Sequence, residues 1–401
     1  MPRVRVLLAS DSFDPAVGGV QRVVRDLADG LVAAGHAVHV LAPWAPGLAD
    51  DEELGGVPVA RVRLGRPALR ARALLGFARR LPGARRRVAA LLLAFRPDVV
   101  HLHFLQSPLA HLLPSACAAR GVPLVATAHG RDVGDMVADD ALGRRAVRTV
   151  LATAAAVTAP SAATLAQARA LAQARAPAQA GELAGAAAGE AGAAGAALWR
   201  PVPNALPADA RAWLGAPPAR GGAGVVAVGE LHQKKGFDVL LRALAELPGV
   251  PLRIGGEGAQ RGELEALAAE LGIAARVTFG GFVPRRALHA FLAGAAVQAV
   301  PSRREPFGLV LLEGMAAGLP VVASRTEGIP EVVGDSGAAL LVPPDDPAAL
   351  AAALRSVLGD AALATRLAAA GRARAALHTS ERTTAAYLAV YDAAMSQESR
   401  P

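Results

Sequence analysis

Short apolar runs rich in β-branched residues alternate along the chain with stretches in which apolar residues recur every third or fourth position. The runs predict buried strands and the stretches predict amphipathic helices, and this alternation is typical of parallel sheets covered by helices on both faces. In the first half, strands are predicted at Val4–Ala9, Ala37–Leu41, Val57–Val62, Asp98–His103, Pro123–Ala128, Ala155–Ala159 and Pro201–Pro203. In the second half, they are predicted at Val225–Gly229, Pro251–Ile254, Arg276–Phe279, Ala296–Val300, Pro320–Ala323 and Ala339–Val342.

A length of 401 residues favours two domains over one. Proline and glycine interrupt both periodicities over residues 204–224, which places a hinge there. We therefore predict one doubly wound domain over residues 1–205 and a second over residues 206–378. Because ligands bind such sheets outside the carboxyl ends of the strands, two facing domains would form a site in the cleft between them.

The helical periodicity is clearest at Val20–Ala34, Asp238–Leu247 and Glu263–Leu271. A last helix is predicted at about Ser380–Ala394, with Tyr387 and Tyr391 on one face. We expect the C-terminal segment, residues 379–401, to pack back onto the first domain through this face.

Residues 162–197 are low in complexity and consist mainly of alanine and glycine. The first part is compatible with a helix, whereas glycines spaced through the remainder favour a loose loop. We assign no chemistry to this segment.

Apolar residues make up 53% of the chain and charged residues 19%, so material for a core is plentiful and global disorder is disfavoured. No apolar run approaches the roughly 18–20 residues that a membrane-spanning helix needs. The N-terminus reaches Asp11 too early for a signal peptide, and the single cysteine, Cys117, excludes an internal disulfide and a cysteine-built metal site. These features predict a soluble, cytoplasmic protein.

The strongest chemical signal is the segment 301–324, Pro-Ser-Arg-Arg-Glu-Pro-Phe-Gly-Leu-Val-Leu-Leu-Glu-Gly-Met-Ala-Ala-Gly-Leu-Pro-Val-Val-Ala-Ser. A polar loop holds Glu305, and a helix is predicted to begin near Phe307–Gly308 and to end at Gly318. The free amides and the dipole of its first turn suit an anion such as a diphosphate. Glu313 lies roughly 7–8 Å further along the helix axis, about the reach from a diphosphate to the ribose of the same nucleotide. Two glutamates alone could be surface charges, but the Pro-Phe-Gly between them and the flanking strands favour a site.

These features resemble family 4 of the retaining glycosyltransferases, and the resemblance extends over nearly the whole chain. It implies the GT-B fold, in which two Rossmann-like doubly wound domains, an acceptor-side domain and a nucleotide-sugar domain, face each other across a cleft. It also implies that Glu305 lies at the hexose of a nucleotide-sugar donor and that Glu313 binds the ribose. The backbone amides of Phe307, Gly308 and Leu309 would hold sugar hydroxyls and phosphate.

Other landmarks follow in the order that the family shows. Gly18 and Gly19, after the first strand, resemble the loop that approaches the donor phosphates and the acceptor. His129, after a strand, matches a histidine that contacts the donor sugar, although a lone histidine at a strand end is usually structural. Gly281 and Phe282 resemble the loop whose backbone meets the nucleobase.

The start of the second domain departs from the family pattern. The family usually has an arginine after the glycine that ends the first strand and a lysine further on, both at the diphosphate. Lys235 matches the lysine, with Lys234 as a near alternative, but Glu230 stands at the arginine position. This reversal of charge puts in question how the diphosphate is bound, or whether catalysis is retained. A smaller departure is Glu327, where the family usually has a pair of glycines.

The resemblance implies transfer of a hexose from a nucleotide-diphosphate sugar, UDP- or GDP-linked, to a glycan, glycolipid or small-molecule acceptor. Glu305, His129 and Lys235 are the predicted catalytic residues. The sequence has no Asp-x-Asp triad and no metal-ligand spacing, so we expect no metal and no cofactor, with Lys235 and the helix N-terminus stabilising the leaving diphosphate. Two alternatives stay open: a nucleotide-binding protein of the same shape that has lost catalysis, and a nucleotide-sugar epimerase.

The net charge of +8 is concentrated in one region. Its eleven arginines are Arg61, Arg63, Arg66, Arg70, Arg72, Arg79, Arg80, Arg85, Arg86, Arg87 and Arg96. Only 3% of residues are aromatic and no nucleic-acid-binding motif is present, which disfavours a nucleic acid as partner. A phosphorylated substrate or an anionic lipid surface fits better.

Two interpretations of these arginines stay open. The first is a solvated helical face. The second is a patch for the inner surface of a membrane, which would suit a lipid-linked acceptor. Apolar residues interleave with the arginines as in a basic amphipathic segment. They are Leu69, Leu74, Leu75, Phe77 and Leu81.

Overall fold

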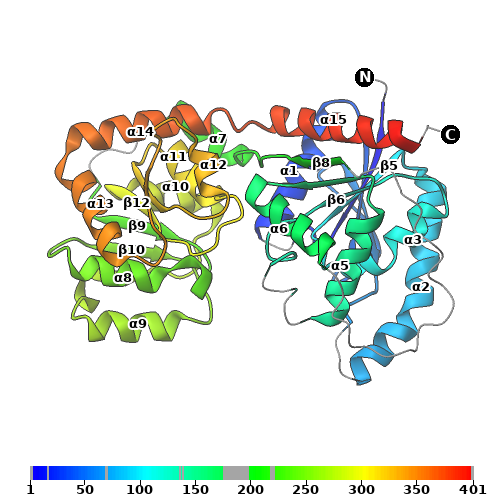
Figure 1. Cartoon of the computed structure of the whole chain (residues 1–401), viewed down its shortest axis with the longest axis horizontal. Coiled ribbons are helices and arrows are strands. Elements are labelled where there is room, and N and C mark those ends of the chain that lie inside the picture. The colour runs from blue at the N-terminus through cyan, green and yellow to red at the C-terminus, as the bar shows by residue number, and fades with distance from the viewer. Residues whose placement is uncertain are drawn as a thin grey trace. The chain divides into compact units, whose positions relative to one another are not determined.

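The computed structural model of the chain describes residues 3–15, 18–67, 71–134, 137, 140–174, 198–216 and 222–398 (Figure 1). The chain divides into two compact units. Unit 1 comprises Met1–Val202 together with Glu381–Pro401, and unit 2 comprises Pro203–Ser380. The chain therefore leaves unit 1 once and returns to it with its last helix.

Unit 1 is built on an 8-stranded sheet in the order β3-β4-β2-β1-β5-β6-β7-β8. The strands are β1 (Arg5–Ser10), β2 (Ala37–Pro43), β3 (Asp51–Leu54), β4 (Val57–Val62), β5 (Val99–His103), β6 (Leu124–Thr127), β7 (Ala156–Ala159) and β8 (Leu198–Pro201). All neighbours pair in parallel except β3 and β4, which are antiparallel. The direction of strand order reverses between β1 and β5, and doubly wound sheets bind ligands at such a point, outside the carboxyl ends of the strands.

Helices cover both faces of this sheet (Figure 1). They are α1 (Gly19–Ala33), α2 (Ala71–Phe95), η1 (Pro108–His111), α3 (Leu113–Ala118), α5 (Ala141–Thr153), α6 (Ala162–Gln173) and α15 (Ser380–Glu398). One core lies between the sheet and α2, α3, α5 and α6, and a second lies between the sheet and α1 and α15. Alternate residues of β1 supply the two cores: Leu7 enters the first, and Val6 and Leu8 enter the second.

Two tyrosines anchor α15 in the second core. The side chains of Tyr387 and Tyr391 are fully buried among residues such as Val6 and Val99. The Tyr391 hydroxyl also forms a hydrogen bond of 2.7 Å with Nδ1 of His101, on β5. The last helix is therefore an integral part of the core of unit 1.

Unit 2 is built on a 6-stranded parallel sheet in the order β11-β10-β9-β12-β13-β14. The strands are β9 (Val225–Val228), β10 (Leu252–Gly255), β11 (Val277–Phe279), β12 (Val297–Val300), β13 (Val321–Ser324) and β14 (Leu340–Val342). The direction of strand order reverses between β9 and β12, which places the switch point of unit 2 between these two strands.

Helices also cover both faces of the second sheet. They are α7 (Ala208–Arg211), η2 (Ala212–Gly215), η3 (Gln233–Lys235), α8 (Phe237–Ala245), α9 (Arg261–Glu270), η4 (Ala274–Arg276), α10 (Arg285–Ala293), α11 (Leu309–Ala316), α12 (Ile329–Val333), α13 (Pro347–Gly359) and α14 (Ala361–Ala375). Helices α8, α9 and α13 pack on one face, and α10, α11 and α12 pack on the other.

Each predicted strand overlaps an observed one, and two differences have physical reasons. The last strand of unit 1 is Leu198–Pro201 rather than Pro201–Pro203, because the apolar side chains of Leu198 and Trp199 pack against the sheet. The strand β3 was not predicted, because its sequence Asp-Glu-Glu-Leu has no apolar alternation. It pairs with β4 as a hairpin across Gly55-Gly56, a turn signal that the sequence contains, but the run before the turn lacks the apolar residues that mark a strand.

Some predictions fall on residues that the structure does not describe. The start of the low-complexity segment forms α6, and the remainder of the predicted loose loop, from residue 175 to 197, lies outside the described residues. So do residues 217–221 of the predicted hinge, and residues 69 and 70 of the arginine-rich region.

Nine arginines of the arginine-rich region fall into two groups. Four arginines form ion pairs with acidic residues of unit 1: Arg61 with Glu52, Arg63 with Asp50, Arg66 with Asp11, and Arg87 with Asp51. Five exposed arginines on α2 pair with no acidic residue in the described part of the chain: Arg72, Arg79, Arg80, Arg85 and Arg86. Phe77 and Leu81 pack against the core, so the apolar residues of this region do not form one outward face. Leu74 and Leu75 are exposed, Leu75 to 64%.

Within the described ranges, no single helix is long and apolar enough to cross a bilayer. The helices α13 and α14 reach the required length and composition only as a pair bent by 101°. Leu350 and Leu354 of α13 and Leu367 of α14 lie in the core of unit 2.

The burial of Tyr391 predicts a graded loss of stability in unit 1. Tyr391→Ala should lower the free energy of unfolding by about 3–5 kcal/mol, because it leaves a cavity under α15. Tyr391→Phe should cost about 1–3 kcal/mol, because it leaves His101 without its partner. Denaturant unfolding measures both, with Ala389→Ser, at an exposed position of the same helix, as control. Equal losses in the two tyrosine variants would contradict the packing role of the ring.

Candidate active site

Unit 2 places Lys235 and Glu305 in contact at its switch point. Lys235 ends η3, which follows β9, and Glu305 lies in the loop that follows the neighbouring strand β12. Nζ of Lys235 donates a hydrogen bond of 2.6 Å to Oε2 of Glu305, and the hydroxyl of Ser302 donates to the same oxygen at 3.2 Å. Glu305 is buried, and these two donors stabilise its carboxylate.

Local geometry holds Lys235 in place. Nδ1 of His232 accepts a hydrogen bond of 3.2 Å from the amide of Lys234 at the start of η3. Gly236 ends η3 with a φ of 64°, and a Cβ atom there would collide with the carbonyl oxygen of Pro301. Only glycine fits this position. The glycine thus allows the loop after β9 to press against the loop after β12.

The helix α11 begins beside Glu305. Gly308, which precedes it, has a φ of 104°, a left-handed conformation that favours glycine. The amides of Leu309 and Val310, the first two residues of the helix, have no acceptor within it. The side chain of Phe307 is buried in the core, so this residue can contribute only its backbone. The predicted anion site is therefore formed by backbone groups.

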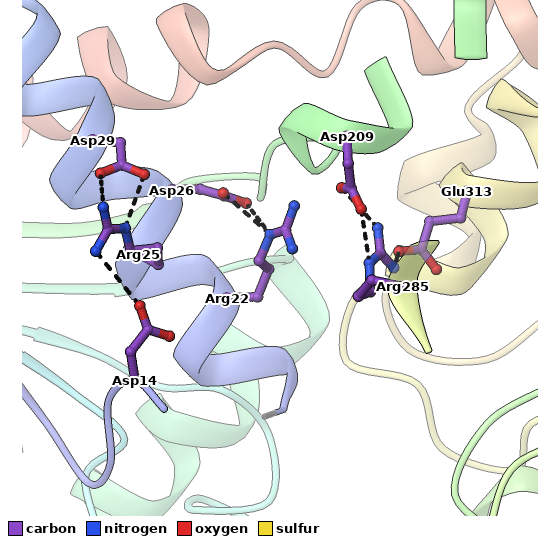
Figure 2. A network of polar contacts seen from close by, with 8 residues as sticks. All are labelled: Asp14, Arg22, Arg25, Asp26, Asp29, Asp209, Arg285 and Glu313. Carbon is purple, nitrogen blue, oxygen red and sulfur yellow. Dashed lines mark hydrogen bonds and ion pairs between the residues drawn. The ribbon is translucent and has the colours of Figure 1, made fainter. Parts of the chain in front are cut away.

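Glu313 lies in the same helix and is held by an arginine (Figure 2). Its Oε1 accepts a hydrogen bond from Nη1 of Arg285, the first residue of α10. The same guanidinium donates to both carboxylate oxygens of Asp209 on α7, at 3.0 and 2.9 Å. Burial lowers the pKa of Arg285, but the carboxylates of Asp209 and Glu313 raise it by more, so the arginine stays charged.

The loop predicted to meet a nucleobase follows β11. Gly281 has a φ of 66°, and its carbonyl oxygen accepts a hydrogen bond of 2.7 Å from the amide of Gly256. The side chain of Phe282 is 58% exposed. The loop thus combines a fixed backbone with an aromatic ring in solvent. It ends at Pro284, directly before Arg285.

Both departures from the family pattern have partners in the structure. Glu230 is paired with Lys234 at 2.9 Å, so the charges in this loop sum to +1: one from Lys234, one from Lys235 and minus one from Glu230. Glu327 has a φ of 41°, a conformation in which glycine is unstrained, and its carboxylate is held by Arg304 at 3.0 Å. The backbone therefore keeps the glycine-like geometry that the family pattern implies, and an ion pair anchors the side chain.

In unit 1, α1 begins directly at Gly19 and is braced by ion pairs (Figure 2). Arg25 pairs with Asp14 at 3.5 Å and with Asp29 at 2.9 Å, and the preceding turn carries Arg22. A Cβ atom on Gly19 would meet none of the described residues within 4 Å. Steric crowding by the protein therefore does not require glycine at this position. The open space beside its backbone is compatible with close approach of a ligand.

His129, after β6, is half-buried and joins a cluster with the fully buried His101 and His103. Its Nε2 lies 3.1 Å from Nδ1 of His103, at the end of β5, and its amide donates to Asp132 at 2.8 Å. Loss of hydration lowers the pKa of His129 to about 4 and that of His101 to about 3, and it lowers the pKa of His103 well below its usual value. Neighbouring imidazoles add to the effect at His101 and His103. The cluster is therefore uncharged at neutral pH.

Asp132 holds the loops that follow β5 and β6 in place. Its carboxylate also accepts a hydrogen bond of 2.7 Å from the amide of Leu105. Burial raises the pKa of Asp132 to about 6, although these backbone donors partly offset the effect. The adjacent Phe104 has a φ of 67°, a strained conformation for a bulky residue. Asp132 thus ties this strained turn to the loop that carries His129.

The sequence did not identify several residues that the structure brings to these sites. They are His101, His103, Asp132, Asp209, Arg285 and Ser302. The His-Leu-His alternation of β5 was a usable signal, because two histidines on one face of a buried strand need polar partners. No group of acidic, histidine or cysteine side chains in the described part of the chain could hold a metal ion.

Two family profiles match the chain. Residues 219–374 match the profile described as Glycosyl transferases group 1, and residues 17–178 match Glycosyltransferase Family 4. Glycogen synthase of Mycobacterium tuberculosis strain H37Rv is 31% identical over 419 residues, which span 99% of this chain and 97% of that protein. D-inositol 3-phosphate glycosyltransferase of Acidothermus cellulolyticus is 37% identical over 214 residues, or 50% of this chain and 46% of that one.

Solved structures show the same fold. Sucrose-phosphate synthase from Thermosynechococcus elongatus superposes with a TM-score of 0.75 at 27% identity, over 97% of this chain and 98% of that one. Anabaena Alr3699/HepE in complex with UDP-glucose gives a TM-score of 0.69 at 21% identity, over 96% of this chain and 100% of that one. The predicted fold class, GT-B with two parallel-sheet α/β domains, is confirmed.

The uncharged histidines predict that acid destabilises the protein. Unfolding returns His101 and His103 to a pKa near 6.5, so the unfolded chain takes up protons that the folded chain excludes. Each excluded proton costs about 1.4 kcal/mol for every pH unit below that value. Asp132 acts in the opposite direction between its unfolded pKa of 3.8 and its folded pKa of about 6, but it is a single group. The melting temperature should therefore fall as the pH is lowered from 7 to 5.

A melting series at pH 7, 6 and 5 measures this effect. His101→Gln removes one of the histidines that exclude a proton in the folded state, so this variant should be less stable at pH 7 but should lose less on acidification. A melting temperature that stays constant or rises toward pH 5 would contradict the uncharged, buried state of the cluster.

Proposed function

The chain belongs to family 4 of the GT-B glycosyltransferases, and we propose that it moves a hexose from a UDP- or GDP-linked sugar onto a glycan, glycolipid or small-molecule acceptor, with retention of configuration and without a metal. In this proposal, unit 2 binds the nucleotide-sugar, and unit 1 contributes His129, the Gly18–Gly19 loop and the recognition of the acceptor. The Anabaena protein of the same fold, which was solved with UDP-glucose, supports a uridine nucleotide.

The observation that carries the proposal is the contact between Lys235 and Glu305 beside the first turn of α11. It combines an ammonium group, a carboxylate and free helix amides at the switch point of one sheet. A diphosphate requires the ammonium group and the amides. A sugar ring that develops positive charge during transfer requires the carboxylate.

We assign the roles as follows. The bond from the anomeric carbon to the diphosphate oxygen breaks, and the acceptor oxygen forms its bond on the same face of the sugar. The departing phosphate oxygen takes the acceptor proton. Lys235 and the amides of α11 stabilise the charge that collects on the diphosphate, while Glu305 stabilises the oxocarbenium-like sugar.

The uncharged state of His129 suits the same transition state. An imidazolium beside the anomeric carbon would repel the positive charge that develops there. A neutral imidazole can hydrogen-bond a sugar hydroxyl without that penalty. The low pKa of His129, about 4, is therefore consistent with its proposed place at the sugar.

The pairing of Glu230 with Lys234 bears on the alternative of a protein that has lost catalysis. Because Lys234 offsets the negative charge, Lys235 still contacts Glu305. Retained turnover is the expectation that follows. A protein that binds a nucleotide but neither transfers nor hydrolyses its sugar would instead support the alternative.

The first test is a thermal-shift panel with UDP, GDP, ADP, TDP and CDP, with and without EDTA, followed by donor hydrolysis and transfer. We expect one nucleotide to raise the melting temperature by several degrees, and EDTA to leave the shift unchanged. Glu305→Gln and Lys235→Ala should each lower kcat about 100-fold or more, because each removes a group aimed at developing charge.

Two variants serve as controls. Glu270→Gln changes an exposed glutamate at the end of α9 and should leave kcat unchanged. Lys234→Ala separates the two lysines: its effect should be well below that of Lys235→Ala. If Glu305→Gln and Lys235→Ala both turn over at the rate of the unsubstituted protein, the assigned mechanism is wrong.

For the arginine-rich helix we propose contact with an anionic lipid surface, which would suit a lipid-linked acceptor. The support is narrower than the whole region: Leu74, Leu75 and the five arginines of α2 without acidic partners among the described residues. Each arginine near an anionic surface contributes about 1 kcal/mol, so several together give measurable binding at low salt.

Co-sedimentation with vesicles tests this contact. Vesicles that contain phosphatidylglycerol should retain the protein at low salt, and pure phosphatidylcholine vesicles should not. The triple variant Leu75→Ser, Arg79→Gln, Arg86→Gln should no longer bind the phosphatidylglycerol vesicles. The control variant, in which the exposed Arg242 and Arg366 of unit 2 are changed to glutamine, should still bind them. Absence of binding to both kinds of vesicle would leave α2 as a solvated face.

A further inference from the structure

Arg285 is the residue of unit 2 whose position the proposed mechanism does not explain. It is the first residue of α10, where a cation faces the positive end of the helix dipole. Helix electrostatics therefore disfavours an arginine at this point. The neighbouring Arg286 carries the same cost and is exposed to solvent.

Two carboxylates account for Arg285 but not for Arg286. The guanidinium of Arg285 binds Asp209 through Nε and Nη2, at 3.0 and 2.9 Å, and binds Glu313 through Nη1 (Figure 2). The two-pronged contact with Asp209 fixes the plane of the guanidinium, which a lysine could not do. The remaining nitrogen is thereby aimed at one oxygen of Glu313.

Glu313 needs this partner because of its surroundings. Its side chain is buried, and the neighbouring residues Leu312 and Met315 are fully buried apolar residues. A buried carboxylate without a cation is strongly destabilised. A carboxylate can accept about four hydrogen bonds, and the bond from Arg285 reaches Oε1. The contact with Arg285 by itself therefore does not exclude ribose hydroxyls as further donors to the same carboxylate.

The elements that Arg285 joins are the parts of the proposed nucleoside site. The residue directly follows the loop 280–284, which we assign to the nucleobase. Its partner Glu313 is the residue that we assign to the ribose. Its other partner, Asp209, lies on α7, which packs against α11 through Ala210 and Leu311. One side chain thus ties the base loop to the ribose carboxylate.

We propose that Arg285, held by Asp209, is the positioning residue of the ribose subsite, and that it presets Glu313 to accept hydrogen bonds from the 2′- and 3′-hydroxyls of a nucleoside diphosphate. This inference rests on the proposed function, because it presumes that unit 2 binds a nucleotide. It predicts that the contribution of Arg285 to affinity is confined to ligands that carry ribose hydroxyls. A carboxylate fixed in advance loses less conformational entropy when those hydroxyls bind.

The test compares UDP with 2′,3′-dideoxy-UDP by isothermal titration calorimetry. The unsubstituted protein should bind UDP at least about tenfold more tightly than the dideoxy analogue, since hydrogen bonds to a charged group are the strong ones. Arg285→Gln should weaken UDP roughly tenfold and change the affinity for the analogue less than about twofold. Asp209→Asn should also weaken UDP more than the dideoxy analogue, but by a smaller factor than Arg285→Gln does.

Arg286→Gln is the matched control. It removes the same charge from the same helix turn, so it should leave both affinities and their ratio unchanged. Melting temperatures of all variants, measured without nucleotide, establish that each is folded.

Several outcomes would overturn the inference. If Arg285→Gln weakens both nucleotides equally, the arginine supports the fold of the site rather than the ribose subsite. If it leaves UDP unaffected or tightens it, Arg285 does not position Glu313. If the unsubstituted protein binds neither UDP in this titration nor GDP in the thermal-shift panel, the proposed function itself is wrong and the inference falls with it.

Discussion

Burial of two carboxylates is the constraint on which the arrangement of unit 2 depends. Glu305 and Glu313 are both buried, and a buried carboxylate is tolerated only beside a cation and hydrogen-bond donors. Lys235 is the cation beside Glu305, and Arg285 is the cation beside Glu313. These cations come from distant parts of the sequence, 70 residues from Glu305 in one case and 28 from Glu313 in the other. The fold must therefore bring separate loops together before either glutamate is stable.

Strand order explains how that is done. Because β9 and β12 are neighbours although β10 and β11 separate them in the sequence, the loops after them meet at the switch point. Gly236 allows these two loops to pack closely, since any side chain there would collide with Pro301. Gly236, the ion pair between Lys235 and Glu305, and the start of α11 lie in contact with one another. A substitution in any of them is therefore expected to disturb the others.

Most of this architecture could be predicted from the sequence, because it is written in short-range patterns. Buried parallel strands are continuous apolar runs, and their alternation with helices defines a doubly wound sheet. The start of α11 was equally visible, since Pro306 and Gly308 mark it. The strand β3 was missed because its acidic sequence lacks the apolar alternation of a strand, although Gly55-Gly56 before β4 is a hairpin signal.

The partners of the site residues were the part that could not be predicted. Arg285 is one of 42 lysines and arginines, and nothing near it in the sequence distinguishes it from Arg286. Only the packing of α7 against α11 brings Asp209 close enough to select one of the two. Glu230 illustrates the reverse case: a departure from a family pattern was visible in the sequence, but its compensation by Lys234 required side-chain geometry.

The charged groups around Glu305 and Glu313 in unit 2 and the histidine cluster of unit 1 are held by different means, and this contrast bears on the proposed chemistry. Unit 2 pairs buried carboxylates with cations, which keeps charge in place for a charged ligand. Unit 1 instead buries histidines that are uncharged at neutral pH and joined to one another and to Tyr391. A neutral hydrogen-bonding cluster leaves the charge balance of a reaction unchanged, whereas an imidazolium would oppose a cationic transition state. In the proposed transfer, the charged groups of unit 2 would meet the diphosphate and the sugar, and the uncharged His129 would meet the sugar without adding positive charge.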